Sequence, residues 1–126
     1  MRILLSGAAF LVASMTALPS AHGQNATEQF IPLGQSPGAS GTLTSIGEIG
    51  ETDARGQTLS LVEASGSRTV KITEKTRIFL DRSKLKQTNV TGTYADLKKG
   101  RRVEVKYEDP ASKQTADWIK VEITQP

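Results

Sequence analysis

The sequence predicts an all-β fold, a small antiparallel OB-like barrel of five to six strands with one short helical turn near residues 93–99. Short runs in which apolar and polar residues alternate, as in 102–107 and 118–123, predict strands with one buried face. Turn-forming segments such as 53–56 and 109–112 separate these runs, which favours antiparallel pairing. A single helical turn late in the chain is compatible with a barrel, whose closure removes most sheet edges.

Each expected element has a local reason. Thr93 can cap the helical turn, Lys98 and Lys99 suit its C-terminal end, and Gly100 can close it in a left-handed conformation. The expected strands cover residues 42–49, 58–62, 69–73, 76–80, 102–107 and 118–123. Fourteen aliphatic side chains are expected to form the core: Leu43, Ile46, Leu59, Leu61, Val70, Ile72, Ile78, Leu80, Leu97, Val103, Val105, Ile119, Val121 and Ile123.

The first 23 residues have the pattern of a cleaved secretory signal peptide. Arg2 precedes the apolar run 3–12, and Ala21 and Gly23 are small residues at the cleavage positions. The apolar run is shorter than the ~20 residues that a bilayer requires, so we expect no transmembrane anchor after cleavage. We therefore expect a periplasmic or secreted protein, with a flexible polar leader over 24–40 and a single β-barrel domain over 41–124.

Cleavage after Gly23 would leave a mature chain without His, Cys or Met, because His22, Met1 and Met15 all precede the cut. A cut after Ala21 would retain His22. Without these residue types a catalytic triad, a cysteine nucleophile and a zinc, copper or haem site lack their usual groups. We expect no enzymatic activity, no catalytic residues and no cofactor. The balance of 16 Lys and Arg against 13 Asp and Glu also argues against specific DNA binding.

One acidic cluster is a weak candidate for calcium. Glu48, Glu51 and Asp53 could offer the oxygen ligands that this cation takes, but their spacing matches no calcium-binding loop. A solvated loop is the simpler interpretation, so we predict no metal site.

A basic stretch is the main candidate for binding. If the aliphatic residues of 70–80 point inward, Lys71, Lys75, Arg77 and Phe79 share the outer face, a combination suited to an anionic polymer. Trp118 would point away from the core beside Lys120, where it could stack on a ligand or anchor a barrel rim. A second basic group surrounds the helical turn: Lys98, Lys99, Arg101 and Arg102. The alternative for both basic groups is a solvated face.

The order of these elements resembles an uncharacterised family of small exported bacterial proteins, described as a domain of unknown function with an OB-like β-barrel. The resemblance covers residues 41–124 and rests on Gly41 with its following strand, on 70–72 leading to Thr76, on the segment 95–100 followed by 103–105, and on 116–121. It implies an exported, non-catalytic module and assigns no site residues.

Together these observations predict an exported binding or accessory module that presents its basic face to an envelope protein, a glycan or another polyanion. Two alternatives are a structural envelope-stress accessory that docks onto another envelope protein through a strand edge, and a calcium-responsive module.

Overall fold

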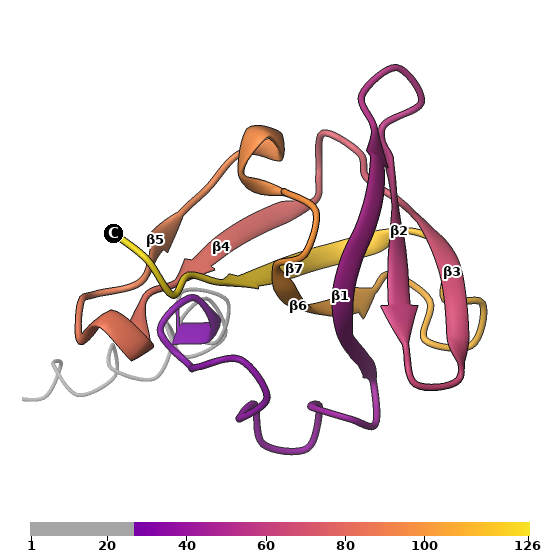
Figure 1. Ribbon diagram of the computed structural model, residues 1–126. Helices are drawn as coiled ribbons and strands as arrows, with labels where there is room; N and C mark the ends of the chain where they lie inside the picture. Colours follow the sequence, from indigo (N-terminus) through magenta and orange to yellow (C-terminus); the bar gives the residue numbers. More distant parts are fainter. Residues whose placement is uncertain (1–26) are drawn as a thin grey trace, which may run out of the picture.

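The computed structural model describes residues 27–126 and shows an all-β chain built on one seven-stranded sheet (Figure 1). The expected signal peptide, 1–23, and residues 24–26 lie outside the described residues. Two single-turn 3-10 helices, η2 (Ser83–Leu85) and η3 (Tyr94–Asp96), lie between strands. The strands are β1 (Thr44–Asp53), β2 (Thr58–Glu63), β3 (Gly66–Lys71), β4 (Arg77–Asp81), β5 (Val90–Thr91), β6 (Arg102–Tyr107) and β7 (Ala116–Glu122).

The all-β class is confirmed, but the antiparallel barrel of five to six strands is wrong. The strand order is β3-β2-β1-β6-β7-β4-β5, and β4 runs parallel to β7 while the other pairs are antiparallel. The sheet is therefore mixed, and it is not closed. After β3 the chain bends at 72–76 and joins the opposite half of the sheet. An isolated bridge between Lys71 and Thr115 still brings the end of β3 beside the beginning of β7.

Strand β1 is long because it serves both halves of the sheet. It pairs with β6 from Thr44 to Glu48 and with β2 from Glu48 to Asp53, and its register with β2 shifts between Ile49 and Thr52. A Cβ at Gly47 would lie 2.3 Å from the carbonyl oxygen of Val62. Glycine at position 47 thus permits the close approach of the two backbones.

The apolar core lies on the inner face of the curled sheet. Of the fourteen predicted core aliphatics, ten are buried, Ile46, Leu80 and Ile123 are partly buried, and Leu43 is 38% exposed. Leu43 precedes β1 and belongs to a turn instead of a strand. Three further side chains, Ile49, Tyr107 and Ala116, complete the buried cluster.

The predicted helical turn is present as η3. The backbone N–H of Thr93 donates to the Asp96 carboxylate at 2.8 Å, and Gly100 adopts a φ of 88°. The N–H of Gly100 then donates to the carbonyl of Ile49 at 2.7 Å. This contact joins the end of the turn to β1 and sets the direction in which β6 begins.

Residues 27–43, which we call the strap, lie against the sheet and are drawn in the indigo part of Figure 1. The sequence predicted a flexible leader over 24–40. Instead, the described part of that segment forms successive turns and hydrogen-bonds to side chains of β4, β6 and β7. The physical reason is that the outer face of these strands carries buried polar groups that the strap satisfies.

Candidate functional site

The outer face of β6, β7 and β4 is the surface that the sequence pattern assigned to solvent. Side chains alternate along each strand, so those between the core residues point to the opposite face. The register places Glu104 of β6 opposite Lys120 of β7, and Lys120 opposite Phe79 of β4. One row of side chains thus crosses three strands beneath the strap.

The aromatic members of this face are buried, contrary to the expected exposed platform. Phe79 is 5% exposed and Trp118 is 3% exposed, and their ring centroids lie 6.3 Å apart. The ammonium of Lys120 lies 4.7 Å from the centroid of the Trp118 ring, within the range of a cation–π interaction. The predicted binding residues Phe79, Trp118 and Lys120 therefore come together and are buried. The strap contacts the two strand neighbours of Phe79, because Glu28 and Ser36 bind Lys120 and Gln29 binds Thr91.

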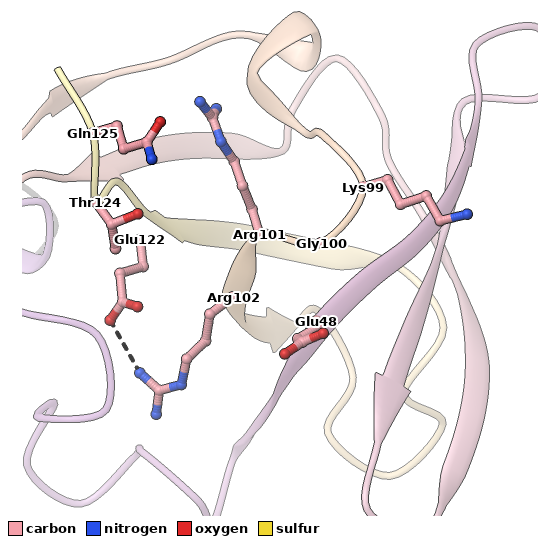
Figure 2. A pocket seen from close by; sticks show the side chains of 8 residues that line it. All are labelled: Glu48, Lys99, Gly100, Arg101, Arg102, Glu122, Thr124 and Gln125. Atoms are coloured by element: carbon pink, nitrogen blue, oxygen red, sulfur yellow. Dashed lines mark hydrogen bonds and ion pairs between the residues drawn. The ribbon is translucent and has the colours of Figure 1, made fainter.

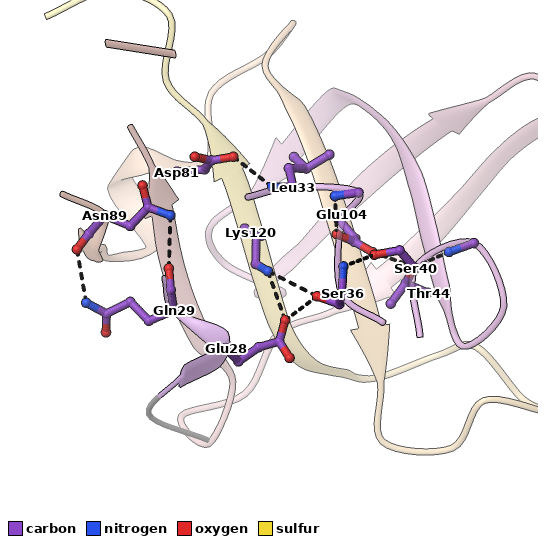
Figure 3. Close-up of polar contacts among 12 residues, drawn as sticks. Glu28, Gln29, Leu33, Ser36, Ser40, Thr44, Asp81, Asn89, Glu104 and Lys120 are labelled. Carbon is purple, nitrogen blue, oxygen red and sulfur yellow. Dashed lines mark hydrogen bonds and ion pairs between the residues drawn. The ribbon is translucent and has the colours of Figure 1, made fainter. Parts of the chain in front are cut away.

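Lys120 is fully buried and pairs with the strap (Figure 3). Its Nζ lies 2.9 Å from a carboxylate oxygen of Glu28 and 3.4 Å from the hydroxyl oxygen of Ser36. The Ser36 hydroxyl also donates to the same Glu28 carboxylate. A buried ammonium is costly without an opposite charge, so Glu28 supplies the compensation that this position requires.

Glu104 is the second buried charge of the outer face. Its carboxylate accepts hydrogen bonds from the backbone N–H of Gly34 at 2.8 Å, the Ser40 hydroxyl at 2.6 Å and the Thr44 hydroxyl at 2.7 Å (Figure 3). All three donors belong to the strap or to the first residue of β1. Glu104 thus fixes the strap at its centre and at its junction with the sheet.

Asp81 holds the strap at the end of β4. Its carboxylate accepts from the backbone N–H of Leu33 at 2.8 Å and from that of Ser83 at 2.9 Å. Burial by itself would raise the pKa of Asp81, but these hydrogen bonds and the charge of Lys120 hold the pKa below its usual value. Nearby, Asn89 and Gln29 exchange two side-chain hydrogen bonds with each other's carbonyls, at 3.0 and 3.1 Å.

The cations of the predicted basic face are separated by the fold. Lys71 at the end of β3 and Lys75 in the following bend are exposed. The Arg77 guanidinium lies 3.2 Å from Asp117, which also binds Lys106 at 3.3 Å. Because Arg77 is already paired and Phe79 is buried, the expected combination of cations and an exposed ring does not form.

Three members of the second basic group line an open hollow of about 500 Å³ between the beginning of β6 and the end of β7 (Figure 2), and the fourth, Lys98, is exposed outside that lining. Arg101 and Arg102 diverge from adjacent positions. Arg102 lies 3.3 Å from the carboxylate of Glu122, which Lys84 also approaches at 3.3 Å. Arg101 donates to the carbonyl of Asp96 at 2.9 Å. The lining residues are Glu48, Lys99, Gly100, Arg101, Arg102, Glu122, Thr124 and Gln125.

The three carboxylates weighed as calcium ligands have other surroundings. Glu51 lies 3.2 Å from Lys99, and Asp53 accepts the backbone N–H groups of Arg55 and Gly56 at 3.0 and 3.2 Å. Glu48 faces the hollow. Within residues 27–126, no group of three or more acidic, His or Cys side chains could hold a metal ion.

No protein-family model, no curated protein and no solved structure matches this chain. The family resemblance inferred from the sequence therefore stays a prediction. Over the described residues, no helix combines the length and the apolar character needed to cross a membrane.

Proposed function

We propose that this chain is an exported, non-catalytic module that binds an acidic partner through the hollow beside β6. The observation that supports this proposal is the gathering of Lys99, Arg101 and Arg102 around one open concavity. Concave sites with a few oriented charges are typical of binding surfaces. The partner would be an acidic protein, an acidic glycan or another polyanion of the envelope.

The lining of the hollow has a small excess of positive charge, which favours an anionic group with one or two negative charges. Its lining carries three cations against the carboxylates of Glu48 and Glu122. The side chain of Glu122 is only 10% exposed and already has Arg102 and Lys84 as partners, whereas the side chain of Lys99 is 75% exposed. A carboxylate or sulfate group entering the hollow would meet the guanidinium groups of Arg101 and Arg102, whereas the ammonium of Lys99 points away from them in Figure 2 and lies 3.2 Å from Glu51. Such rim charges chiefly contribute orientation and association rate.

The export part of the proposal rests on the signal-peptide pattern of residues 1–23. The non-catalytic part rests on the residue types that would remain after cleavage. We also propose that the sheet is OB-like in its connectivity. In support, β1 pairs with both β2 and β6, and β7 meets both β4 and the end of β3 through parallel contacts.

Paired neutralisations test the location of the site. The first variant carries Arg101→Gln and Arg102→Gln in the hollow, and its matched control carries Lys71→Gln at the end of β3 and Lys75→Gln in the bend that follows. Both lose two positive charges, so a purely global charge effect would weaken both equally. Binding of a labelled poly-L-glutamate is measured by fluorescence anisotropy at low salt.

We expect the hollow variant to bind about tenfold more weakly, because two surface contacts of ~0.7 kcal/mol each sum to that ratio. The control should stay close to the parent. Equal losses in the two variants, or no loss in the hollow variant, would contradict the proposed site. Far-UV circular dichroism of both variants checks that the sheet is intact.

A further inference from the structure

The strap is held to the sheet mainly by polar contacts. Among its described aliphatic and aromatic side chains, Leu33 is the buried one, whereas Phe30 is 55% exposed. Its attachments to the outer face run through the carboxylates of Glu104 and Asp81 and the ammonium of Lys120. A segment attached in this way can leave without opening the apolar core, which lies on the other face of the same strands.

The surface beneath the strap has the chemistry of a binding site. Phe79 and Trp118 offer two packed rings, and Lys120 places an ammonium over one of them. A carboxylate of the strap, that of Glu28, occupies this ammonium. The chain thus displays the ligand group that the surface accepts, on a segment of its own that forms successive turns.

We propose that the strap, residues 27–43, is the internal occupant of a covered peptide-binding site. The site is formed by Phe79, Trp118 and Lys120, and an acidic segment of a partner protein replaces the strap there, with a carboxylate on Lys120 in place of that of Glu28. This proposal is independent of the hollow beside β6, because the two sites use different residues. Variants of the hollow leave Glu28 and Lys120 unchanged.

The strap is covalently linked to the sheet, and this linkage determines how readily a separate peptide can replace it. A segment joined to its site by a short linker acts at an effective concentration on the order of millimolar. Three strap glycines adopt positive φ, and Gly41, with φ 82°, lies just before β1. Glycine tolerates this conformation and rotates away from it at little steric cost, which suits a hinge. Weakening the Glu28–Lys120 contact should therefore lower the barrier for a peptide added in solution.

Trp118 is the only tryptophan of the chain, and it reports on the strap through Lys120, whose ammonium lies 4.7 Å from the ring centroid and pairs with Glu28. Acrylamide quenching of its fluorescence is compared between the parent protein, Glu28→Gln and the control Glu51→Gln, which alters an exposed ion pair of the same type. We expect a several-fold larger quenching constant in Glu28→Gln, unchanged circular dichroism, and no change in Glu51→Gln. A Trp118 that stays shielded in Glu28→Gln would overturn the proposal.

Native-state hydrogen exchange of the parent protein provides a measurement that does not depend on a variant folding. The amides of Leu33 and Gly34, which donate to Asp81 and Glu104, should exchange through an opening with little denaturant dependence. The amides of β6 and β7 should exchange only through global unfolding. Identical opening free energies for both sets would show that the strap does not leave on its own and would refute the proposal.

Peptide addition tests the ligand class. A synthetic peptide with the sequence of residues 27–43 is titrated into the Glu28→Gln protein, and the matched control is the same peptide with Gln in place of Glu28. The first peptide should restore the shielding of Trp118 and the second should bind several-fold more weakly. Equal effects of the two peptides would exclude recognition of the carboxylate, and no effect of either would exclude the site.

Discussion

Replacement of Glu104 by alanine tests how much stability the polar contacts of the strap contribute. The carboxylate is fully buried and accepts three hydrogen bonds of 2.6 to 2.8 Å. Hydrogen bonds to a charged group contribute about 1.5–3 kcal/mol each. The Ser40 and Thr44 hydroxyls can turn to other acceptors, whereas the Gly34 N–H is fixed by the backbone. We therefore expect Glu104→Ala to lower the free energy of unfolding by about 3–5 kcal/mol.

The variant Glu104→Gln keeps the size of the side chain and removes its charge, so it separates the loss of the carboxylate from the loss of side-chain volume. Glu104→Gln keeps the shape and one carbonyl oxygen, so its cost should be about 1–2 kcal/mol. Urea unfolding followed by Trp118 fluorescence and by circular dichroism gives both values, with Glu48→Ala as an exposed control within about 0.5 kcal/mol of the parent. The reasoning is refuted if Glu104→Ala costs less than about 1 kcal/mol, or if the glutamine variant is as unstable as the alanine variant.

Two further predictions concern backbone approach and pH. Gly47→Ala should destabilise the protein by about 1–3 kcal/mol, because its Cβ would meet the Val62 carbonyl oxygen at 2.3 Å, while Gly56→Ala in the exposed turn after β1 should cost much less in the same urea assay. The lowered pKa of Asp81 stabilises the fold above the unfolded-state pKa of about 3.9, and this contribution is lost as the pH falls through the folded-state value. Unfolding midpoints measured during acidification should therefore fall less steeply in Asp81→Asn, and equal slopes would contradict this assignment.

Strands and turns that depend on residues close together in the chain were predicted well from the sequence, because strand alternation and turn chemistry act over a few residues. In β6 and β7 the period-two alternation places Val103, Val105, Ile119 and Val121 in the core, where the structure has them. The helical turn at η3 begins after its predicted N-cap residue Thr93, but it ends at its C-cap Leu97, and Gly100 adopts its left-handed conformation three residues further on, where the chain turns toward β6. Short-range chemistry of this kind is readable from one sequence.

The pairing of distant strands was not predictable in the same way. The sequence pattern of 76–80 is equally compatible with antiparallel and parallel neighbours, because alternation fixes only which side chains share a face. In the structure β4 pairs in parallel with β7, from Arg77 opposite Trp118 to Asp81 opposite Glu122, and the inner-face pairs are Ile78 with Ile119 and Leu80 with Val121. Apolar pairing on the inner face decides that register, and it requires knowledge of both strands at once.

The candidate site shows a related limit. Alternation correctly separates Phe79, Trp118 and Lys120 from the core face, but it carries no information on what covers the opposite face. Two signals in the sequence point to a cover. The leader contains the apolar run 30–33 within a polar stretch, and the adjacent outward positions of β6 and β7 hold Glu104 and Lys120, two charges that need partners.

The balance between closed and open strap follows from the same chemistry. If the cover were apolar, opening it would expose aliphatic surface to water. That exposure costs about 25 cal/mol of free energy per Å², and no gain in hydration would offset it. Opening this strap instead returns the buried charges of Glu104, Lys120 and Asp81 to water, so their recovered hydration offsets part of the lost hydrogen bonds. Any exposure of the Phe79 and Trp118 rings in the open state favours renewed binding, either of the strap or of a peptide of similar chemistry. A polar cover over an aromatic and cationic face is therefore better suited to exchange than to permanent structure.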